Sequence, residues 1–243
     1  MAEVLAAVLE QERRARIVEA VADKAGQLPV DVLMQRVCRF VVDEAAASDC
    51  TMVLIAGSEP VATLAGAGCH ARAITDLQFE LGEGPCLDAH GTGFPVLLPD
   101  LVAQGSIRWP VFTQVATSLG VRAEFCFPLG IGVNSVGVLN LCRDEPGMLS
   151  KELLADALVA ADIARDALLY LEEPPGDNDL TALLDAVGMD RLVVHQAAGM
   201  IAAQLGEAPS DALARLRGAA FESGRSIYSI AQDVIERRVR LGE

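Results

Sequence analysis

The segment Gly82-Glu83-Gly84-Pro85-Cys86 contains the residue types of a reactive thiol site. A proline is well tolerated in the first turn of a helix, so the segment predicts a helix that begins beside Cys86. A helix N-terminus lowers the pKa of a nearby thiol, and the thiolate is the reactive form. Cys86 is therefore a candidate ligand-sensing or redox-sensing residue. The simpler interpretation is a tight glycine turn followed by a small buried side chain.

Trp109 is the single tryptophan, and it lies between Arg108 and Pro110 where a helix is expected to begin. An aromatic side chain there can line a ligand pocket or anchor the packing of the helix. We take it as the second candidate sensing residue, with packing as the alternative.

The remaining donor residues do not predict a metal centre or a catalytic site. Cys69 and His70 are adjacent, but no further ligands follow at metal-binding spacing, so a surface loop is expected. The six cysteines contain no CxxC pair, which argues against a zinc ribbon or a disulfide framework. No Ser-His-Asp arrangement or catalytic carboxylate pair is recognisable. We expect a protein that is not an enzyme, and the ligand or cofactor is unknown.

A different chemistry is suggested by the C-terminal arginines. The chain has a formal net charge of -15, which opposes nonspecific binding to phosphate backbones. Residues 1–182 carry 26 acidic and 12 basic residues, whereas residues 183–243 carry 8 acidic residues and 7 arginines. Guanidinium groups bind phosphates in bidentate geometry and stack on unpaired bases. The C-terminal region is therefore the candidate nucleic-acid-binding part.

Length and composition predict two folded domains. The chain has 243 residues, of which 52% are hydrophobic, and domains of about 100–150 residues are common. A polar linker with Pro174, Pro175 and Gly176 separates the two charge regions. We expect an N-terminal helix over 1–27 that can serve dimerisation, a domain over 28–172, a linker over 173–179 and a small domain over 180–243. No secretory signal or membrane-spanning run is recognisable, so a cytoplasmic protein is expected.

Hydrophobic periodicity in the first region predicts an α+β fold. Apolar residues recur at helical spacing over residues 2–24, after Pro29, and over 151–170, and another helix is expected at 109–120. Two hairpins are predicted, one pairing 50–55 with 61–65 and one pairing 124–129 with 136–141. Hairpins make antiparallel neighbours, so we expect an antiparallel sheet with helices on one side.

Four motifs of this region resemble those of GAF domains in bacterial regulators: "GEGPC" at 82–86, "RWP" at 108–110, "FPLG" at 127–130 and "VGVLNL" at 136–141. The resemblance covers residues 28–172 and implies a sensor of a small molecule or of redox state. The cyclic-nucleotide signature of some GAF domains is not recognisable.

The second region predicts three short helices. A short apolar cluster of Leu183, Leu184 and Val187 precedes a helix that begins near Asp190 and ends at Gly206. Ser210 is the expected N-cap of the next helix, which ends at Gly224, and Ser226 is the expected N-cap of the last.

This triplet resembles the ANTAR domain, an all-α RNA-binding module of bacterial transcription antitermination regulators. The matching residues are "QAAGM" at 196–200, "LARLRGAA" at 213–220 and "SIYSIAQDVI" at 226–235. The resemblance implies a homodimer that binds tandem stem-loops in a nascent transcript. One position departs from the family: Ala198 stands where a basic residue is usual, which would weaken the attraction to phosphate.

Five residues are the candidate RNA contacts. Arg217 matches the family's arginine in the second helix, and Arg225 and Ser226 lie at a helix N-terminus, which favours an anion. Arg191 and Tyr228 are the next two candidate RNA contacts. Arg237, Arg238 and Arg240 are expected to form a solvated helix end. Gly199, inside the first helix, is expected where another helix packs closely, with direct RNA contact as the alternative.

The sequence thus predicts a signal-responsive RNA-binding regulator that promotes transcription antitermination under the control of a GAF sensor. Two alternatives come from other classes. The three helices could form a DNA-binding helix-turn-helix, although the last helix is largely apolar or small. The GAF domain could instead be a redox-active enzyme that uses Cys86.

Overall fold

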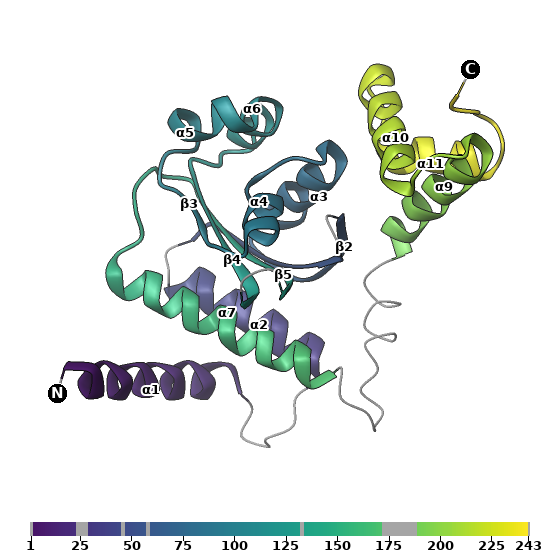
Figure 1. The fold of residues 1–243 in the computed structure, drawn as a ribbon. Helices are drawn as coiled ribbons and strands as arrows, with labels where there is room; N and C mark the ends of the chain where they lie inside the picture. Colours follow the sequence, from purple (N-terminus) through teal and green to yellow (C-terminus); the bar gives the residue numbers. More distant parts are fainter. Residues whose placement is uncertain are drawn as a thin grey trace.

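A five-stranded antiparallel sheet organises the first region of the computed structural model (Figure 1). The structure describes residues 2–22, 29–44, 47–56, 59–131, 134–171 and 189–242. The strand order is β2-β1-β5-β4-β3. The strands are β1 (Asp49–Ala56), β2 (Glu59–Ala67), β3 (Val96–Leu98), β4 (Ala123–Ile131) and β5 (Asn134–Arg143).

Both predicted hairpins are present. They are joined into one sheet because the first strand of the first hairpin pairs with the last strand of the second. β1 pairs with β2 and β4 pairs with β5, each antiparallel. β1 also pairs with β5, where Asp49 lies opposite Cys142 and Leu54 opposite Gly137. The short strand β3 extends the sheet beyond β4 and was not predicted.

Helices cover both faces of the sheet, so the prediction of helices on one side is wrong (Figure 1). The physical reason lies in β4, where Phe125 and Phe127 pack against α2 and α7 while Cys126 packs beside α4. A strand that is apolar on both faces must be buried on both. One face carries α2 (Val30–Glu44) and α7 (Lys151–Leu171), and α1 (Ala2–Val21) packs on the outer side of these two helices. The other face carries α3 (Ala71–Leu81), α4 (Pro85–Thr92), α5 (Leu101–Arg108) and α6 (Pro110–Ser118).

The N-terminal helix α1 is attached to α7 by ion pairs and by two buried side chains. Ile17 and Val21 are buried in the main core, and Arg13 and Arg16 both bind Asp156. Val8, Leu9 and Val18 remain exposed. The role of this helix in dimerisation stays a prediction.

In the described part of the C-terminal region, residues 189–242, three helices pack together: α9 (Met189–Leu205), α10 (Pro209–Ser223) and α11 (Ile227–Ile235). Their shared core includes Val194, Ile201, Leu216 and Ile230. Gly224 follows α10 with a φ of 63°, in the left-handed region that glycine adopts readily, and ends the helix as predicted. The linker 173–179 and the cluster at 183–187 lie outside the described residues.

Two local predictions in this region are wrong. Ala208, not Ser210, is the N-cap of α10, because Pro209 takes the first helical position and pre-sets the backbone there. Gly199 is exposed, and a Cβ atom on it would meet no atom within 4 Å. Close helix packing therefore does not explain this glycine.

Candidate functional sites

Cys86 lies at the start of α4, where the sequence places it. Pro85 occupies the first turn, and Gly84 precedes it with a φ of 144°. A Cβ atom on Gly84 would collide with the side chain of Gln78, so this position needs glycine. The Cys86 side chain is buried, because the turn directs it toward the sheet rather than toward solvent.

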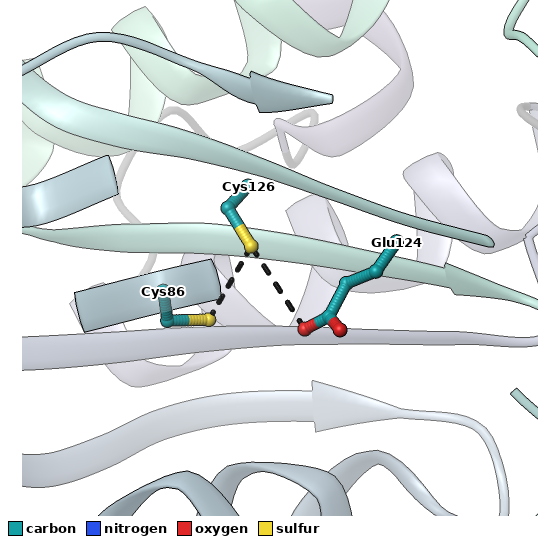
Figure 2. Close-up of side chains that lie close together, drawn as sticks. All are labelled: Cys86, Glu124 and Cys126. Carbon is teal, nitrogen blue, oxygen red and sulfur yellow. Dashed lines mark hydrogen bonds between the residues drawn. The ribbon is translucent and has the colours of Figure 1, made fainter. Parts of the chain in front are cut away.

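Cys86 meets two side chains of β4 that the sequence prediction missed (Figure 2). The Cys86 and Cys126 sulfurs are 3.6 Å apart, and the Cys126 sulfur is 3.9 Å from Oε1 of Glu124. Residues 124 and 126 share one face of β4 because side chains alternate along a strand. We call Cys86, Glu124 and Cys126 the thiol–carboxylate cluster.

Gln78 of α3 orients this cluster. Its Nε2 donates to the Cys86 sulfur and to Oε1 of Glu124, each at 3.2 Å. Its Oε1 accepts from the Cys86 backbone N–H at 2.8 Å. On the sheet side, the Cys126 thiol donates to Oδ1 of Asn140 at 3.3 Å.

Burial controls the protonation of the cluster. It raises the pKa of Glu124 to about 8, against the opposing effect of hydrogen bonds from Asn140, Cys126 and Gln78. Burial also raises the pKa of the Cys126 thiol. The Oε2 atom of Glu124 is buried without a hydrogen-bond partner. The Glu124 carboxylic acid is therefore mostly protonated at pH 7 in the free protein, and the Cys126 thiol is neutral.

Trp109 occupies a second small core rather than this cluster. It caps the N-terminus of α6 and packs with Ile74, Leu101 and Phe112. The Arg108 guanidinium stacks on its ring, 4.4 Å from the ring centre. These contacts are those of a packing anchor.

Two of the predicted RNA contacts, Arg191 and Arg217, bind the GAF-like region instead of facing solvent. Nη2 of Arg191 donates to Oδ1 of Asp76 and to Oγ1 of Thr63, each at 3.1 Å. Arg217 donates through Nε and Nη2 to the Phe79 carbonyl oxygen, at 3.1 and 3.0 Å. Both guanidinium groups also lie over the Phe79 ring. Arg191 is 7% exposed, and burial lowers its pKa.

A cavity of about 250 Å³ lies beside these contacts. Its lining includes Arg72, Asp76 and Glu80 from α3, and Arg191 and Tyr228 from the C-terminal helices. Burial and the neighbouring Asp76 raise the pKa of Glu80. Cations, acids and aromatic rings thus surround one cavity between the two regions.

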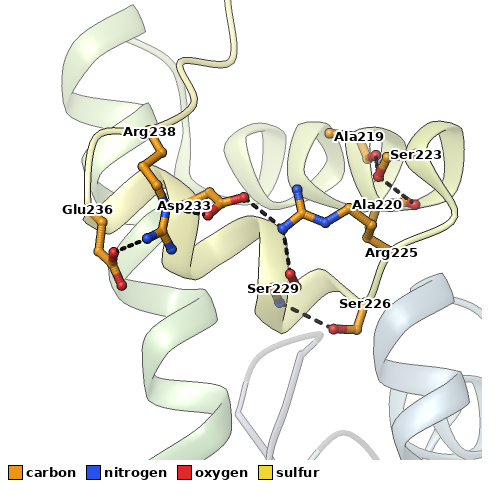
Figure 3. Close-up of polar contacts among 9 residues, drawn as sticks. All are labelled: Ala219, Ala220, Ser223, Arg225, Ser226, Ser229, Asp233, Glu236 and Arg238. Atoms are coloured by element: carbon orange, nitrogen blue, oxygen red, sulfur yellow. Dashed lines mark hydrogen bonds and ion pairs between the residues drawn. The ribbon is translucent and has the colours of Figure 1, made fainter.

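The other predicted RNA contacts surround the N-terminus of α11 (Figure 3). Arg225 donates to Oδ2 of Asp233 at 2.7 Å and to Oγ of Ser229 at 2.6 Å. Arg238 donates to the other oxygen of Asp233 at 2.7 Å. The hydrogen bonds from Arg225 and Arg238 lower the pKa of Asp233. The Arg225 side chain keeps 43% of its surface exposed.

The structure thus divides the five candidates between two places. Arg191, Arg217 and Tyr228 lie near the contact with α3, and Arg225 and Ser226 lie at the solvent-facing end of α11. Ala198 is only 3% exposed within the bundle, so its side chain does not face solvent. Arg237, Arg238 and Arg240 are exposed beyond the end of α11, as expected.

The N-cap of α11 gives a first testable prediction. The Ser226 hydroxyl accepts from the Ser229 N–H at 3.2 Å, so Ser226→Ala removes a cap and should lower the free energy of unfolding by about 1 kcal/mol. Ser210→Ala is the matched control, because Ser210 lies inside α10 and caps nothing. Urea denaturation followed by circular dichroism measures both. A larger loss in Ser210→Ala than in Ser226→Ala would contradict the assignment of the caps.

Comparisons with solved structures identify the fold of the first region. The GAF domain of a phosphoenolpyruvate-protein phosphotransferase from Coxiella burnetii superposes with a TM-score of 0.52, at 15% identity, over 67% of this chain and 94% of that domain. The GAF domain of the Acinetobacter phosphoenolpyruvate-protein phosphotransferase gives a TM-score of 0.51, at 12% identity, over 68% and 95%. No protein-family model and no curated protein matches the sequence.

The first region therefore has a GAF-like fold, as its motifs predict. At this level of identity the likeness shows the fold alone. No comparison bears on the ANTAR resemblance of the C-terminal helices. None of the helices in the described part of the chain is long and apolar enough to cross a membrane.

Proposed function

We propose that this protein is a signal-responsive RNA-binding regulator. The GAF-like domain senses the signal, and the C-terminal bundle binds tandem stem-loops in a nascent transcript so that antitermination follows. The protein acts as a cytoplasmic homodimer and has no catalytic role.

The observation that supports this proposal is the shared contact of Arg191 and Arg217 with Phe79. These two arginines come from different helices of the bundle, and both are held by α3 of the GAF-like domain. The N–H groups that bind Asp76, Thr63 and Phe79 are not available to a phosphate, and the guanidinium faces that lie over the Phe79 ring are not available to a base. We therefore interpret this arrangement as a closed form, in which Arg191 and Arg217 are withheld from RNA.

A signal would act by shifting the population toward an open form. A ligand changes such an equilibrium only by its difference in affinity for the two forms. The cavity between Asp76, Glu80, Arg191 and Tyr228 is lined by both regions, so its shape differs between the closed and the open form. A ligand in this cavity would therefore bind the two forms with different affinities. Opening frees Arg191 and Arg217 to join Arg225 and Ser226 in binding RNA.

The experiment compares two arginines that share one partner. Arg225→Ala removes a predicted RNA contact, and Arg238→Ala removes a cation that binds the same Asp233 carboxylate. Each variant leaves Asp233 with one arginine. We expect Arg225→Ala to weaken the binding of a tandem stem-loop RNA about fivefold. The slope of log affinity against log salt concentration should also fall by about one released counterion. Arg238→Ala should change the RNA affinity less than twofold.

Affinity is measured with the full chain by filter binding over a range of salt concentrations, with duplex DNA as competitor. If duplex DNA displaces the RNA, the helix-turn-helix alternative replaces the proposal. If neither nucleic acid binds in low salt, the regulator function is wrong.

The redox-enzyme alternative is less well supported. The 3.6 Å contact between Cys86 and Cys126 favours thiol chemistry, but Cys86 is only 3% exposed and Cys126 is fully buried. Burial raises the pKa of the Cys126 thiol, which lowers its reactivity. A substrate would have no direct access to either sulfur.

A further inference from the structure

The thiol–carboxylate cluster brings together three side chains that could act as metal ligands. One ligand atom from each of Cys86, Glu124 and Cys126 lies within 4.8 Å of the others, and all three residues are buried. They come from α4 and from alternate positions on β4, so the packing of α4 on the sheet assembles them. Sequence spacing alone does not reveal this group, because 37 residues lie between Cys86 and Glu124.

We propose that Cys86, Glu124 and Cys126 bind a thiophilic divalent cation, for which Zn²⁺ is the reference ion. Tetrahedral zinc with Zn–S bonds of about 2.3 Å and a Zn–O bond of about 2.0 Å places two sulfurs about 3.8 Å apart and a sulfur and an oxygen about 3.5 Å apart. The corresponding distances in the cluster are 3.6 and 3.9 Å. Two soft thiolates with one carboxylate form a ligand set that suits zinc.

The unpartnered oxygen of Glu124 is a second, independent observation. Glu124 is 0% exposed, its Oε2 has no hydrogen-bond partner, and it forms no ion pair with the described residues. A buried polar oxygen without a hydrogen-bond partner is costly. A bound cation supplies this missing partner.

The surroundings of the cluster resemble the outer shell of a metal site. Gln78 donates one N–H to the Cys86 sulfur and the other to Oε1 of Glu124, which orients two of the three ligands. Oδ1 of Asn140 lies 3.3 Å from the Cys126 sulfur and can provide a neutral fourth ligand. Metal binding requires deprotonation of both thiols and of the Glu124 carboxylic acid, so three protons leave to solvent as the ion binds.

A disulfide between the two cysteines accounts for fewer of these features. Such a bond involves neither the carboxylate of Glu124 nor its unpartnered oxygen. The metal site uses all three side chains.

The position of the cluster connects it to the C-terminal bundle. Gln78, which orients the cluster, directly precedes Phe79, which holds Arg191 and Arg217. We expect a change in the Gln78 side chain on metal binding to shift α3 and so to alter the contact that closes the protein. This coupling rests on the proposed RNA-binding function, whereas the metal site itself does not.

The test begins with the full chain, purified under reducing conditions and freed of metal with a chelator. After dialysis against Zn²⁺ or Co²⁺, we expect about one retained metal ion per chain and a thiolate-to-cobalt charge-transfer absorption. Cys86→Ser and Cys126→Ser should each weaken binding by at least about tenfold. Cys69→Ser is the control, because Cys69 is an exposed loop cysteine outside the cluster.

Glu124→Gln provides a variant that keeps the shape of the side chain, and it should also weaken binding. Circular dichroism shows whether each variant remains folded. A wild-type chain that retains no metal, or unchanged binding in the folded Cys86→Ser and Cys126→Ser variants, overturns the metal site.

RNA affinity measured with and without Zn²⁺ separates the two proposals. A change in affinity supports the coupling through α3, and an unchanged affinity overturns the coupling while the metal site stands. Metal binding in a chain that binds no RNA leaves the site intact and refutes the proposed function.

Discussion

Asp76→Ala should raise the affinity of the full chain for tandem stem-loop RNA by about tenfold. Asp76 lies between two arginines, 3.1 Å from Arg191 and 3.4 Å from Arg72. Without the carboxylate, the buried Arg191 loses its counter-charge, and the two guanidinium groups repel each other. The closed form is then destabilised relative to the open form. A tenfold change corresponds to about 1.4 kcal/mol, within the usual range for coupling between sites.

Filter binding of labelled RNA at fixed salt measures this change, and Asp88→Ala is the control. Asp88 is also an acid on the GAF-like domain, but it pairs with Arg108, away from the C-terminal helices. Both variants remove one negative charge, so a general electrostatic effect would raise both affinities equally. Equal increases, or no increase in Asp76→Ala, would show that the contact with α3 does not restrain RNA binding.

Periodicity and turn residues were sufficient to predict most elements of the fold. The two hairpins form because β-branched and apolar runs flank turn-rich segments, and α2 and α7 follow their apolar repeats. The cap at Ser226 also follows from local chemistry. These features depend on residues near one another in sequence, which is the information that a single sequence contains.

The features that were missed depend on residues distant in sequence. Helices were expected on one face only, although the fully apolar run around Phe125, Cys126 and Phe127 indicates burial on both. Helix α3 was not predicted, and it carries Gln78 and Phe79. Without α3, neither the orientation of Cys86 nor the contact with the C-terminal helices could be anticipated.

In the candidate sites too, local features were predicted from the sequence, and contacts between distant residues were not. Cys86 was recognised from its glycine turn and its helix start, both of which are local. Cys126 and Glu124 become its neighbours only because α4 packs on the sheet. The signal that could have identified Glu124 is a charged residue inside an apolar strand, since a fully buried acid is rare unless it has a partner or a function. For Arg191 and Arg217, the sequence predicts the positive charge. It does not predict that the Asp76 carboxylate binds Arg191 or that the Phe79 carbonyl oxygen binds Arg217.

Glu124→Gln should stabilise the metal-free protein above pH 8 by about 5 kcal/mol relative to the wild type. Burial raises the pKa of Glu124 from 4.5 to about 8 in the folded state. Between these values the folded state binds a proton that the unfolded state has released, so the stability of the wild type falls as the pH rises from about 4.5 to about 8. Each unit of pKa difference corresponds to about 1.4 kcal/mol. Glutamine resembles the protonated acid at every pH and does not incur this loss.

Urea denaturation between pH 5 and pH 9, with chelator and reductant present, measures the difference between the two proteins. We expect similar stabilities near pH 5 and an advantage for Glu124→Gln that grows with pH and levels off above pH 8. Glu145→Gln controls for the loss of one negative charge, because Glu145 is exposed in the turn after β5. A difference that stays constant across this pH range would mean that Glu124 titrates alike in the folded and unfolded states. Its burial would then be relieved in solution by a partner or by an opening of α4 that this structure does not contain.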